Sequence, residues 1–446
     1  MNVKDIIEVE IESNGMDGEG VTHLGGKAVF IPYTLKGEKV RAVVKSVKSR
    51  YATASVIKVL RASLMRETPL CSHYFKCGGC DTQHISAEYR REIILNEIAH
   101  NLKSIACVEF TPTEFVSSVA STRNKISMPF GLCGGKVIAG MYRRGTHDVE
   151  PACDCIMAGE LTRVIVNTVV SFANEKKLSV YDEKSGDGLL RHIVVREIDG
   201  RASVTLVVNG ELGDKTENAL AERLPDSADF FISTNTKRNN VIMGDNARLV
   251  KGNARLSVSV LGVRAELSPL SFFQVNDAIR DELYKRAIGY VSSPMLYDLY
   301  SGIGITSNLA AKKCRAVHAV EIVPQAVADA DCTALENGND GIITNHCGTV
   351  ESILPRICGG EAQADVLVDP PRKGCGEAVM SVIAGASPNK LIYISCNHAT
   401  MARDIKLFID ASKVVGNNYE LKEVTAFDMF VGTHHVETLA ELTRKD

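Results

Sequence analysis

The chain has 446 residues, too many for one ordinary hydrophobic core, so two or three domains are expected. A hydrophobic content of 45% is enough for packed cores, and a net charge of −3 excludes a globally basic nucleic-acid-binding protein. The sequence contains no apolar signal region, and no run approaches the roughly 18 apolar residues of a membrane span, so a cytoplasmic protein without membrane contact is expected. In that compartment the 13 cysteines are expected to be buried thiols or metal ligands rather than disulfides.

The N-terminal residues alternate in short apolar strands at 6–11, 28–31, 40–44 and 54–59, separated by glycines. Short strands at this spacing predict a small barrel of the OB type, which we assign to residues 1–62. From Lys36 to Arg66 the chain has nine basic residues and a single acid, Glu38. This stripe is either a phosphate-binding face or a solvated strand face, and charge alone does not choose between them.

A cysteine cluster follows the predicted barrel, in the pattern Cys71-x5-Cys77-Gly-Gly-Cys80. Zinc sites favour two C-x2-C pairs, and only one pair is present in this segment. Three clustered cysteines with a fourth farther along the chain suit a 4Fe–4S cluster, which takes four thiolates. The candidates for the fourth ligand are Cys153 and Cys155. The alternative is a set of unligated buried thiols.

The rest of the chain divides into two further parts. Residues 85–105 have helical periodicity, and residues 115–265 mix strands and helices. We assign 63–270 to a central α+β iron–sulfur domain, whose helix at 85–105 can pack on the catalytic domain. From residue 271 to 446, strands at 296–300, 316–320, 365–368 and 391–395 alternate with helical stretches. This alternation predicts a doubly wound, Rossmann-like α/β domain, which we take as the catalytic domain.

Residues at the ends of two of these strands suggest a nucleotide-like cofactor. Gly302 and Gly304 follow the strand at 296–300, where the absence of a side chain would let a ligand approach the backbone closely. Glu321 ends the next strand and is placed to accept hydrogen bonds from the hydroxyl groups of a ribose. The full G-x-G-x-x-G of dinucleotide enzymes is absent, because position 307 is Ser307. This favours S-adenosylmethionine over NAD.

The two remaining strands end in groups suited to chemistry on a base. Asp369 follows 365–368 and begins Asp-Pro-Pro-Arg, a rigid turn that can hold its carboxylate toward a flat polar ring such as uracil. Cys396 follows the apolar run 391–395, so its thiol is expected at the carboxyl end of a buried strand. An isolated cysteine is usually a small buried hydrophobe, but the neighbouring motifs favour a nucleophile.

With these motifs, the chain resembles the TRAM-domain, iron–sulfur-containing RNA uracil-5-methyltransferases, and among them those that act on 23S ribosomal RNA. The resemblance covers nearly the whole chain and rests on the cysteine cluster and five further segments: Arg123-Asn-Lys125, Leu190–Arg196, Ser271–Asn276, Ser395–Asp404 and Thr433–Glu437.

The resemblance implies a role for each matching residue. The fourth cluster ligand would be Cys155 rather than Cys153, and the methyl donor would contact Gln274, Tyr300, Glu321 and Asp369. Cys396 would be the nucleophile that adds to C6 of uracil, and Glu437 the base that removes the C5 proton. The implied cofactors are S-adenosylmethionine and the 4Fe–4S cluster. The implied partner is RNA, with no obligate protein partner.

The chain departs from the family pattern at five positions, Ser301, Ile305, Thr349, His398 and Val431. The first three bear on donor binding and the last two on loop rigidity, while the nucleophile and the base are retained. Three other functions stay open: methylation of tRNA, radical S-adenosylmethionine methylthiotransfer and NAD-dependent oxidoreduction. A non-catalytic RNA-binding protein would keep the basic barrel but lack the Cys396 and Glu437 pair.

Overall fold

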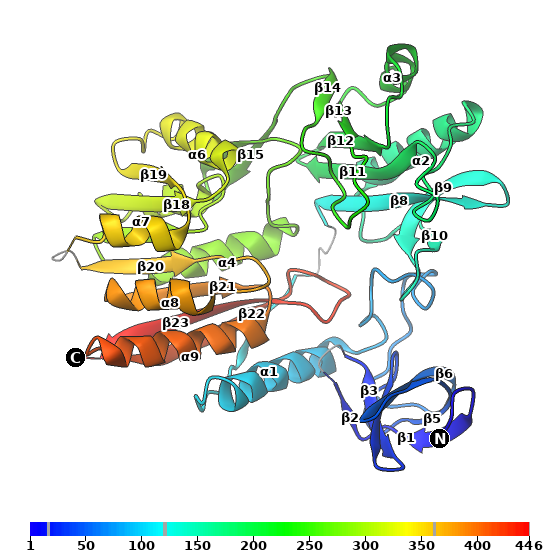
Figure 1. Cartoon of the computed structure of the whole chain (residues 1–446), viewed down its shortest axis with the longest axis horizontal. Coiled ribbons are helices and arrows are strands. Elements are labelled where there is room, and N and C mark those ends of the chain that lie inside the picture. The colour runs from blue at the N-terminus through cyan, green and yellow to red at the C-terminus, as the bar shows by residue number, and fades with distance from the viewer. Residues whose placement is uncertain (16–17, 119–122, 360–362, 446) are drawn as a thin grey trace.

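The computed structural model describes residues 1–15, 18–118, 123–359 and 363–445. Figure 1 shows three parts: a small N-terminal sheet, a central sheet with two helices, and a larger C-terminal sheet flanked by helices. None of the helices in the described ranges is long and apolar enough to cross a bilayer.

The N-terminal part is a six-stranded sheet that curls around its own core (Figure 1). Its strand order is β1-β5-β6-β4-β3-β2, with bounds β1 (Ile6–Glu10), β2 (Ser13–Asn14), β3 (Gly20–Leu24), β4 (Lys27–Ile31), β5 (Lys39–Val47) and β6 (Tyr51–Arg61). Side chains alternate along β5, so that Val40, Ala42 and Val44 are buried while Lys39, Arg41 and Lys45 are exposed.

The basic stripe of this sheet is partly neutralised. Arg41 lies 2.6 Å from Glu8 and Arg61 lies 3.0 Å from Glu10, both acids on β1. The exposed cations that form no ion pair with a described residue include Lys45, Lys48 and Arg50, which we call the basic patch.

Glu38 anchors the curled sheet to residues 62–86, which connect β6 to α1 and which we call the cysteine segment. Its side chain is fully buried, and its carboxylate accepts hydrogen bonds from Arg66 Nε at 2.6 Å and Nη2 at 2.8 Å. The backbone amides of Leu35 and Ser63 donate to the same carboxylate, so the buried charge is fully compensated. Arg66 is therefore a structural cation rather than part of an RNA-facing stripe.

The central part is a seven-stranded sheet in the order β10-β9-β8-β11-β12-β13-β14. Its strands are β8 (Lys125–Cys133), β9 (Lys136–Tyr142), β10 (Val149–Pro151), β11 (Leu190–Ile198), β12 (Arg201–Val208), β13 (Ala228–Thr234) and β14 (Arg248–Lys251). Helix α2 (Glu160–Glu175) contributes Ile165, Val169 and Phe172 to the core of this part, and the short α3 (Asp214–Ala221) adds Leu220.

The C-terminal part contains an eight-stranded sheet in the order β19-β18-β17-β20-β21-β23-β22-β7. Its strands are β17 (Met295–Leu299), β18 (Ala316–Glu321), β19 (Ile343–Cys347), β20 (Ala364–Val368), β21 (Lys390–Ser395), β22 (Asn418–Phe427), β23 (Glu437–Lys445) and β7 (Glu114–Val116). Strands β17 to β21 are parallel, so their carboxyl ends meet at one edge on both sides of the switch point between β17 and β20. The predicted doubly wound α/β domain is confirmed.

Both faces of this sheet are covered. Helices α4 (Asp277–Tyr290) and α5 (Ile305–Ala310) pack on one face together with the hairpin of β15 (Leu256–Val260) and β16 (Val263–Leu267). The other face carries α7 (Val350–Ile357), α8 (Gly376–Gly385) and α9 (His398–Val414). Helix α6 (Pro324–Glu336) packs near the edge formed by β18 and β19.

Helix α1 (Ala87–Ser104) follows the cysteine segment in sequence but packs on α9 of the C-terminal sheet. Its buried side consists of Ile94, Ile98 and Leu102 together with Arg90, whose charge is paired with Asp428. Strand β7 then adds to the same sheet beside β22. Residues 87–116 therefore contribute to the core of the C-terminal part.

Candidate active site

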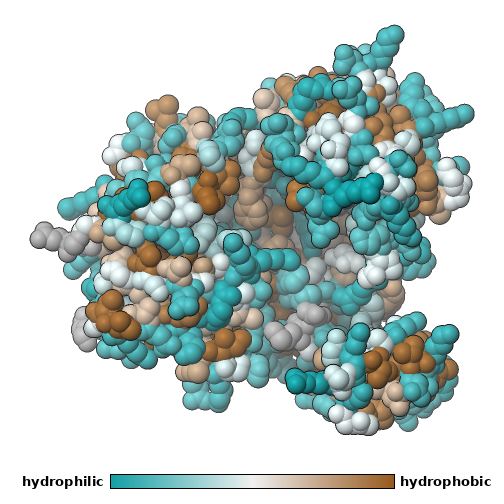
Figure 2. Space-filling view, viewed as in Figure 1, coloured by the Kyte–Doolittle hydropathy of each residue, from teal (hydrophilic) through white to brown (hydrophobic). Residues whose placement is uncertain are grey.

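A cavity of about 740 Å³ opens at the carboxyl ends of the parallel strands. Seven of the eight predicted cofactor and catalytic residues line it: Gln274, Tyr300, Gly302, Glu321, Asp369, Cys396 and Glu437. The eighth, Gly304, does not line the cavity. It adopts a left-handed conformation (φ +81°) as the N-cap of α5, and a Cβ there would lie 3.2 Å from the Cβ of Ala330. Figure 2 shows that the surface is hollowed between the two larger parts of the molecule.

The turn after β17 and the end of β18 form one wall of the cavity. Tyr300 takes a left-handed conformation, with φ of 64°, and its amide donates to the carbonyl of Val320. The carboxylate of Glu321 accepts from the amide of Gly302 at 3.1 Å and from that of Val323 at 2.8 Å. These two bonds fix the carboxylate at the strand end, where it keeps further acceptor positions for a ligand.

Asp369 lies deeper in the cavity, next to a second buried acid. Burial and the charge of Asp298 raise the pKa of Asp369 to about 7, while a hydrogen bond from Gln274 acts in the opposite direction. Asp298 is 1% exposed, and one of its oxygens accepts from Thr306 at 2.7 Å and Ser307 at 2.5 Å. Burial raises the pKa of Asp298 to about 6. Two acids this close disfavour each other's ionisation, so a cationic ligand here would relieve the repulsion.

Cys396 lies between the end of β21 and the start of α9. Burial raises the pKa of its thiol to about 11, the charges of Glu437 and Asp369 act in the same direction, and Arg372 opposes them through its charge and a hydrogen bond. The N-cap Asn397 accepts from the amides of Ala399 and Thr400, which places the thiol beside the positive end of a 17-residue helix.

Glu437 is brought to Cys396 by strand pairing. Ser395 of β21 lies opposite Thr438 of the antiparallel β23, so continuing the register by one residue sets Cys396 against Glu437. The side chain of Glu437 is 3% exposed, and its Oε2 has no hydrogen-bond partner among the described residues. Burial raises its pKa well above the ordinary value, Asp369 adds to the shift, and Arg372 counteracts it. A thiol and a carboxyl whose pKa values are both raised thus lie opposite each other, and the charge of Arg372 counteracts both shifts.

Sequence reasoning assigned no role to three groups that the fold brings to this site. Arg372 follows the Asp-Pro-Pro turn, and its position in that motif is the signal that was available. Asp298 opens the glycine-turn motif and faces Asp369 from the neighbouring strand. Phe430 lines the cavity from the loop between β22 and β23, and no local pattern in the sequence indicated it.

Two of the departures noted in the sequence have structural partners. His398 begins α9, and its Nδ1 lies 2.7 Å from Asn101 Nδ2, which ties that helix to α1. The carbonyl of Val431 accepts from Arg123 Nη2 at 3.5 Å. Thr349 lines the cavity and caps α7 by accepting from the amide of Ser352, while Ile305 is buried in α5.

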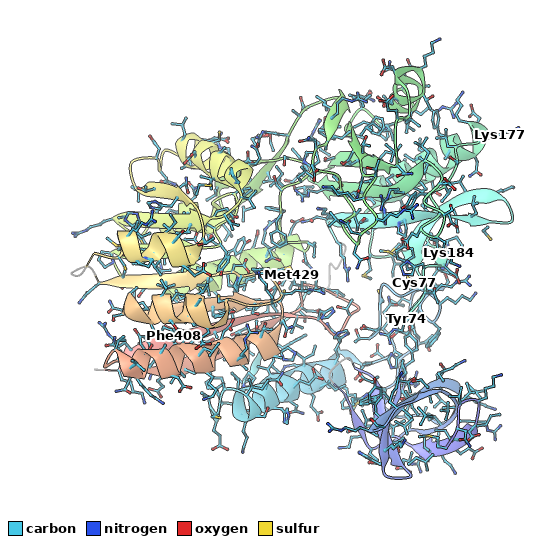
Figure 3. The ribbon with its side chains drawn as sticks, viewed as in Figure 1. Tyr74, Cys77, Lys177, Lys184, Phe408 and Met429 are labelled. Carbon is cyan, nitrogen blue, oxygen red and sulfur yellow. The ribbon has the colours of Figure 1, made fainter. Side chains whose placement is uncertain are left out.

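The cysteine segment forms a separate cavity of about 240 Å³, lined by Cys71, Cys77, Cys80 and Cys155. Figure 3 places Cys77, with Tyr74 nearby, between the N-terminal sheet and the central sheet. Cys153 is not among the lining residues, and its Sγ donates to the carbonyl of Ala139 at 3.3 Å. Within the described ranges, no three or more His, Cys, Asp or Glu side chains meet closely enough to hold a single metal ion.

Two cations also line the cysteine cavity. Burial, with the charge of Arg196, lowers the pKa of Lys125 to about 8. The Nε of Arg123 is buried and lacks a hydrogen-bond partner among the described residues. Four thiols and two cationic side chains therefore line the same cavity.

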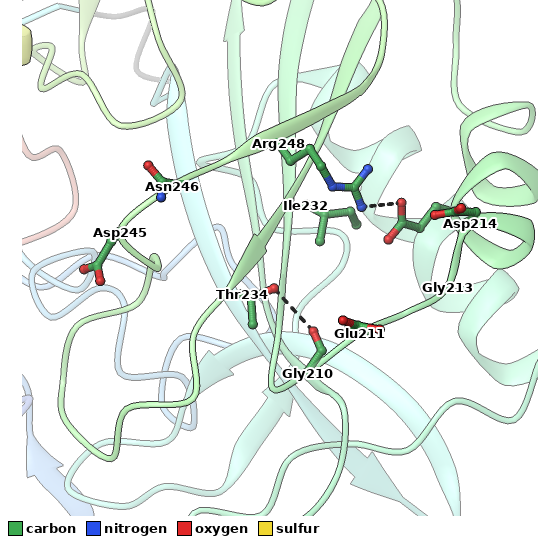
Figure 4. Close-up of a pocket in the computed structure, with 10 residues that line it drawn as sticks. Gly210, Glu211, Gly213, Asp214, Ile232, Thr234, Asp245, Asn246 and Arg248 are labelled. Carbon is green, nitrogen blue, oxygen red and sulfur yellow. Dashed lines mark hydrogen bonds and ion pairs between the residues drawn. The ribbon is translucent and has the colours of Figure 1, made fainter.

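A third cavity, of about 640 Å³, lies in the central part, where β13 ends and β14 begins (Figure 4). It is lined mainly by acids and glycines, and Arg248 pairs with Glu217 at 2.6 Å. Among the described residues that line it there is no cysteine or histidine, so it offers neither a thiol nor an imidazole for catalysis.

A parallel sheet with a glycine turn after its first strand and a carboxylate at the end of its second defines an α/β methyltransferase fold. The crystal structure of Pyrococcus abyssi tRNA (uracil-54, C5)-methyltransferase in complex with S-adenosyl-L-homocysteine has this fold. It matches 98% of this chain and 100% of its own, with a TM-score of 0.77 and 25% identity.

Residues 361–445 match the family model for tRNA (Uracil-5-)-methyltransferase, and residues 2–57 match the TRAM domain. A relative from Caldanaerobacter subterraneus subsp. tengcongensis, described as an uncharacterized RNA methyltransferase, is 34% identical over 98% of both chains. A relative with the same description from Halalkalibacterium halodurans is 34% identical over 100% of this chain and 98% of its own. The chain therefore belongs to the RNA uracil-5-methyltransferases that carry an N-terminal TRAM domain.

Proposed function

We propose that this enzyme uses S-adenosylmethionine to methylate C5 of a uridine in 23S ribosomal RNA, with Cys396 as nucleophile and Glu437 as base. The observation that carries the proposal is the pairing of β21 with β23, which sets the thiol against the carboxyl in the cavity that Asp369 also lines. A thiol opposite a buried carboxyl, next to a site for a cationic donor, suits addition to a ring followed by proton removal.

The chemistry follows from the poor nucleophilicity of uracil C5. The Cys396 thiol first loses its proton to water, and the thiolate then adds to C6. The electron pair of the C5–C6 double bond moves to form an enolate that makes C5 nucleophilic. S-adenosylmethionine supplies the methyl group that C5 receives. Glu437 then removes the C5 proton, the double bond re-forms, and the Cys396 thiolate leaves. Arg372, which lowers the pKa of the thiol, stabilises the thiolate at the start and at the end of this sequence.

The methyl donor would be held by residues from three strand ends. Glu321, oriented by two backbone amides, accepts from the ribose hydroxyls. Asp369 would attract the sulfonium, whose positive charge would offset the repulsion between Asp369 and Asp298. Gln274 favours the ionised form of Asp369, and Gln274, Tyr300 and Gly302 line the same cavity.

The cysteine cavity is suited to a 4Fe–4S cluster held by Cys71, Cys77, Cys80 and Cys155. Four thiols around one cavity match the ligand number of a cubane, whose sulfur ligands bind separate irons and so lie farther apart than the ligands of a single ion. Arg123 and Lys125 would offset the negative charge of four thiolates. When bound, the cluster would hold the cysteine segment against the central sheet.

The RNA would contact the TRAM domain through the basic patch. The named activity of the Pyrococcus abyssi relative supports tRNA as the alternative substrate, while the sequence motifs favour 23S ribosomal RNA. A radical methylthiotransferase is less favoured, because four cysteines line the cavity here and such enzymes leave one iron without a cysteine ligand.

The test uses purified variants with S-adenosylmethionine and in-vitro transcripts of 23S ribosomal RNA and tRNA. Cys396→Ala should neither methylate nor form a covalent complex, because the described site has no second thiol opposite Glu437. Glu437→Gln should accumulate a methylated protein–RNA adduct that survives denaturing gel electrophoresis, because addition and methyl transfer precede proton removal. Cys347→Ala, which removes an exposed cysteine at the end of β19, is the matched control and should behave as wild type. A covalent adduct with Cys396→Ala would refute the assignment.

A further inference from the structure

The loop from Asp428 to Val436, which we call the base loop, connects β22 to Glu437 at the start of β23. The cysteine segment holds this loop at two points. The Asp81 carboxylate accepts from the backbone amide of His434 at 2.8 Å, and its second oxygen lies 2.7 Å from His434 Nδ1. In return, the amides of Asp81 and Thr82 donate to the carbonyl of Gly432 at 2.8 and 3.1 Å.

The base loop and the cysteine segment also pack closely against each other. Gly432 has φ of +81°, and a Cβ added there would lie 3.1 Å from the Sγ of Cys80. A larger residue could therefore neither adopt this backbone conformation without strain nor keep the approach to the cysteine. The side chains of Asp81 and His434 are only 13% and 18% exposed, so these hydrogen bonds are largely shielded from water.

The position of the Glu437 carboxyl depends on the backbone of the base loop that precedes it. Glu437 comes three residues after His434, and its Oε2 has no hydrogen-bond partner among the described residues. The orientation of the Glu437 carboxyl is therefore set by the path of the backbone rather than by side-chain partners. On the other side of the loop, Arg90 holds Asp428 and the carbonyl of Thr433, which leaves the cysteine segment to fix the portion around Gly432 and His434.

We propose that Asp81 is a positioning residue, which acts through His434 and the base loop to aim Glu437 at the C5 proton. The cysteine segment would thereby contribute to the elimination step while being separate from the cavity in which the reaction occurs. This inference rests on the proposed function of Glu437, and it deepens that function by naming the group that orients the base.

The proposal predicts that Asp81 affects proton removal but not methyl transfer. Both steps can be measured with full-length protein. The substrate is an unmodified transcript of whichever RNA the wild-type enzyme methylates, labelled with tritium at uracil C5. Asp81→Asn should leave methyl incorporation into total RNA, free plus protein-bound, within about twofold of wild type in a single turnover. Release of C5 tritium should fall by about tenfold or more, because a charge-assisted hydrogen bond that positions the base is weakened. The methylated covalent adduct should accumulate in proportion.

Two further variants isolate the contact. His434→Ala should reproduce the tritium effect, and the loss in the double variant should be smaller than the sum of the two single losses, because both changes remove the contact between the Asp81 carboxylate and His434 Nδ1. The backbone amide of His434 and the side chain of Arg144 also contact Asp81, so the two single variants need not be identical. Asp148→Asn, at an exposed acid on the turn between β9 and β10, is the matched control and should not change either rate. Affinity for S-adenosylhomocysteine should be equal in all variants, which verifies that the cofactor site is intact.

Equal losses of methyl incorporation and tritium release in Asp81→Asn would overturn the inference, because a purely structural role slows every step alike. Additive effects of Asp81→Asn and His434→Ala would overturn it as well. Failure of the proposed function has a different signature, in which wild-type enzyme forms no covalent intermediate and Glu437→Gln accumulates none.

Discussion

Replacing Arg90 with methionine should loosen the base loop while leaving the rest of the catalytic sheet intact. Arg90 donates to both oxygens of Asp428 at 2.6 and 2.7 Å, and to the carbonyl of Thr433 at 3.2 and 2.7 Å. The two charged side chains are 10% and 7% exposed, so the substitution would leave a buried carboxylate without its partner. Breaking such a pair destabilises by about 3–5 kcal/mol. Methionine retains helix propensity and apolar volume in α1, which confines the effect to the missing charge.

The assay is amide hydrogen exchange, because it reports local opening in a protein of several domains, for which one unfolding free energy is not defined. Amides of Thr433 and His434, whose hydrogen bonds lie within or beside the loop, should exchange about 100-fold faster or more, since 1.4 kcal/mol corresponds to about tenfold. Arg91→Met is the matched control, because among the described residues that exposed neighbour donates only to the carbonyl of Thr113. Exchange within threefold of wild type in Arg90→Met would refute the argument that the buried pair holds the loop.

Three other predictions concern the cofactors and the RNA. Anaerobically purified enzyme should contain about four irons per chain, Cys155→Ser should lose the cluster and Cys153→Ser should keep it, as measured by iron content and absorbance. Zinc without iron would contradict this assignment. Reversing the three charges of the basic patch should reduce the dependence of log K for RNA on log salt by about 0.7–0.9 for each phosphate that the protein no longer neutralises, and an unchanged slope would mean a solvated face. Because the pKa of Asp369 is raised to about 7, this residue is neutral below that pH, so affinity for the cationic S-adenosylmethionine should rise as pH increases from 6 to 8. Calorimetry should find a much smaller change for Asp369→Asn and for the uncharged thioether of S-adenosylhomocysteine.

The order of the strands and helices could be predicted from local sequence patterns. Alternating apolar residues predicted the strands of the curled sheet, and buried runs that end in glycine, acid or cysteine predicted β17, β18, β20 and β21. Because parallel strands present their carboxyl ends at one edge, the sequence also predicted that Glu321, Asp369 and Cys396 would share a site. Their chemistry is local to each strand end, so predicting the fold class and the shared position of these three residues did not require knowledge of distant contacts.

Long-range contacts decided the remainder. The antiparallel register of β21 and β23 brings Glu437 to Cys396, and residues 87–116, which precede the central sheet in the chain, pack on the C-terminal sheet. The basic stripe divides into ion-paired arginines, a buried Arg66 and an exposed patch only once β1 and Glu38 are placed beside it. The sequence motif predicted that Gly304 binds a ligand, but the structure places it against Ala330. A glycine is needed there because the chain packs closely on a helix. In each case, burial and pairing depend on residues tens to hundreds of positions apart. The sequence by itself determines which strands and chemical groups exist, and only the tertiary structure determines which groups face each other and with what charge.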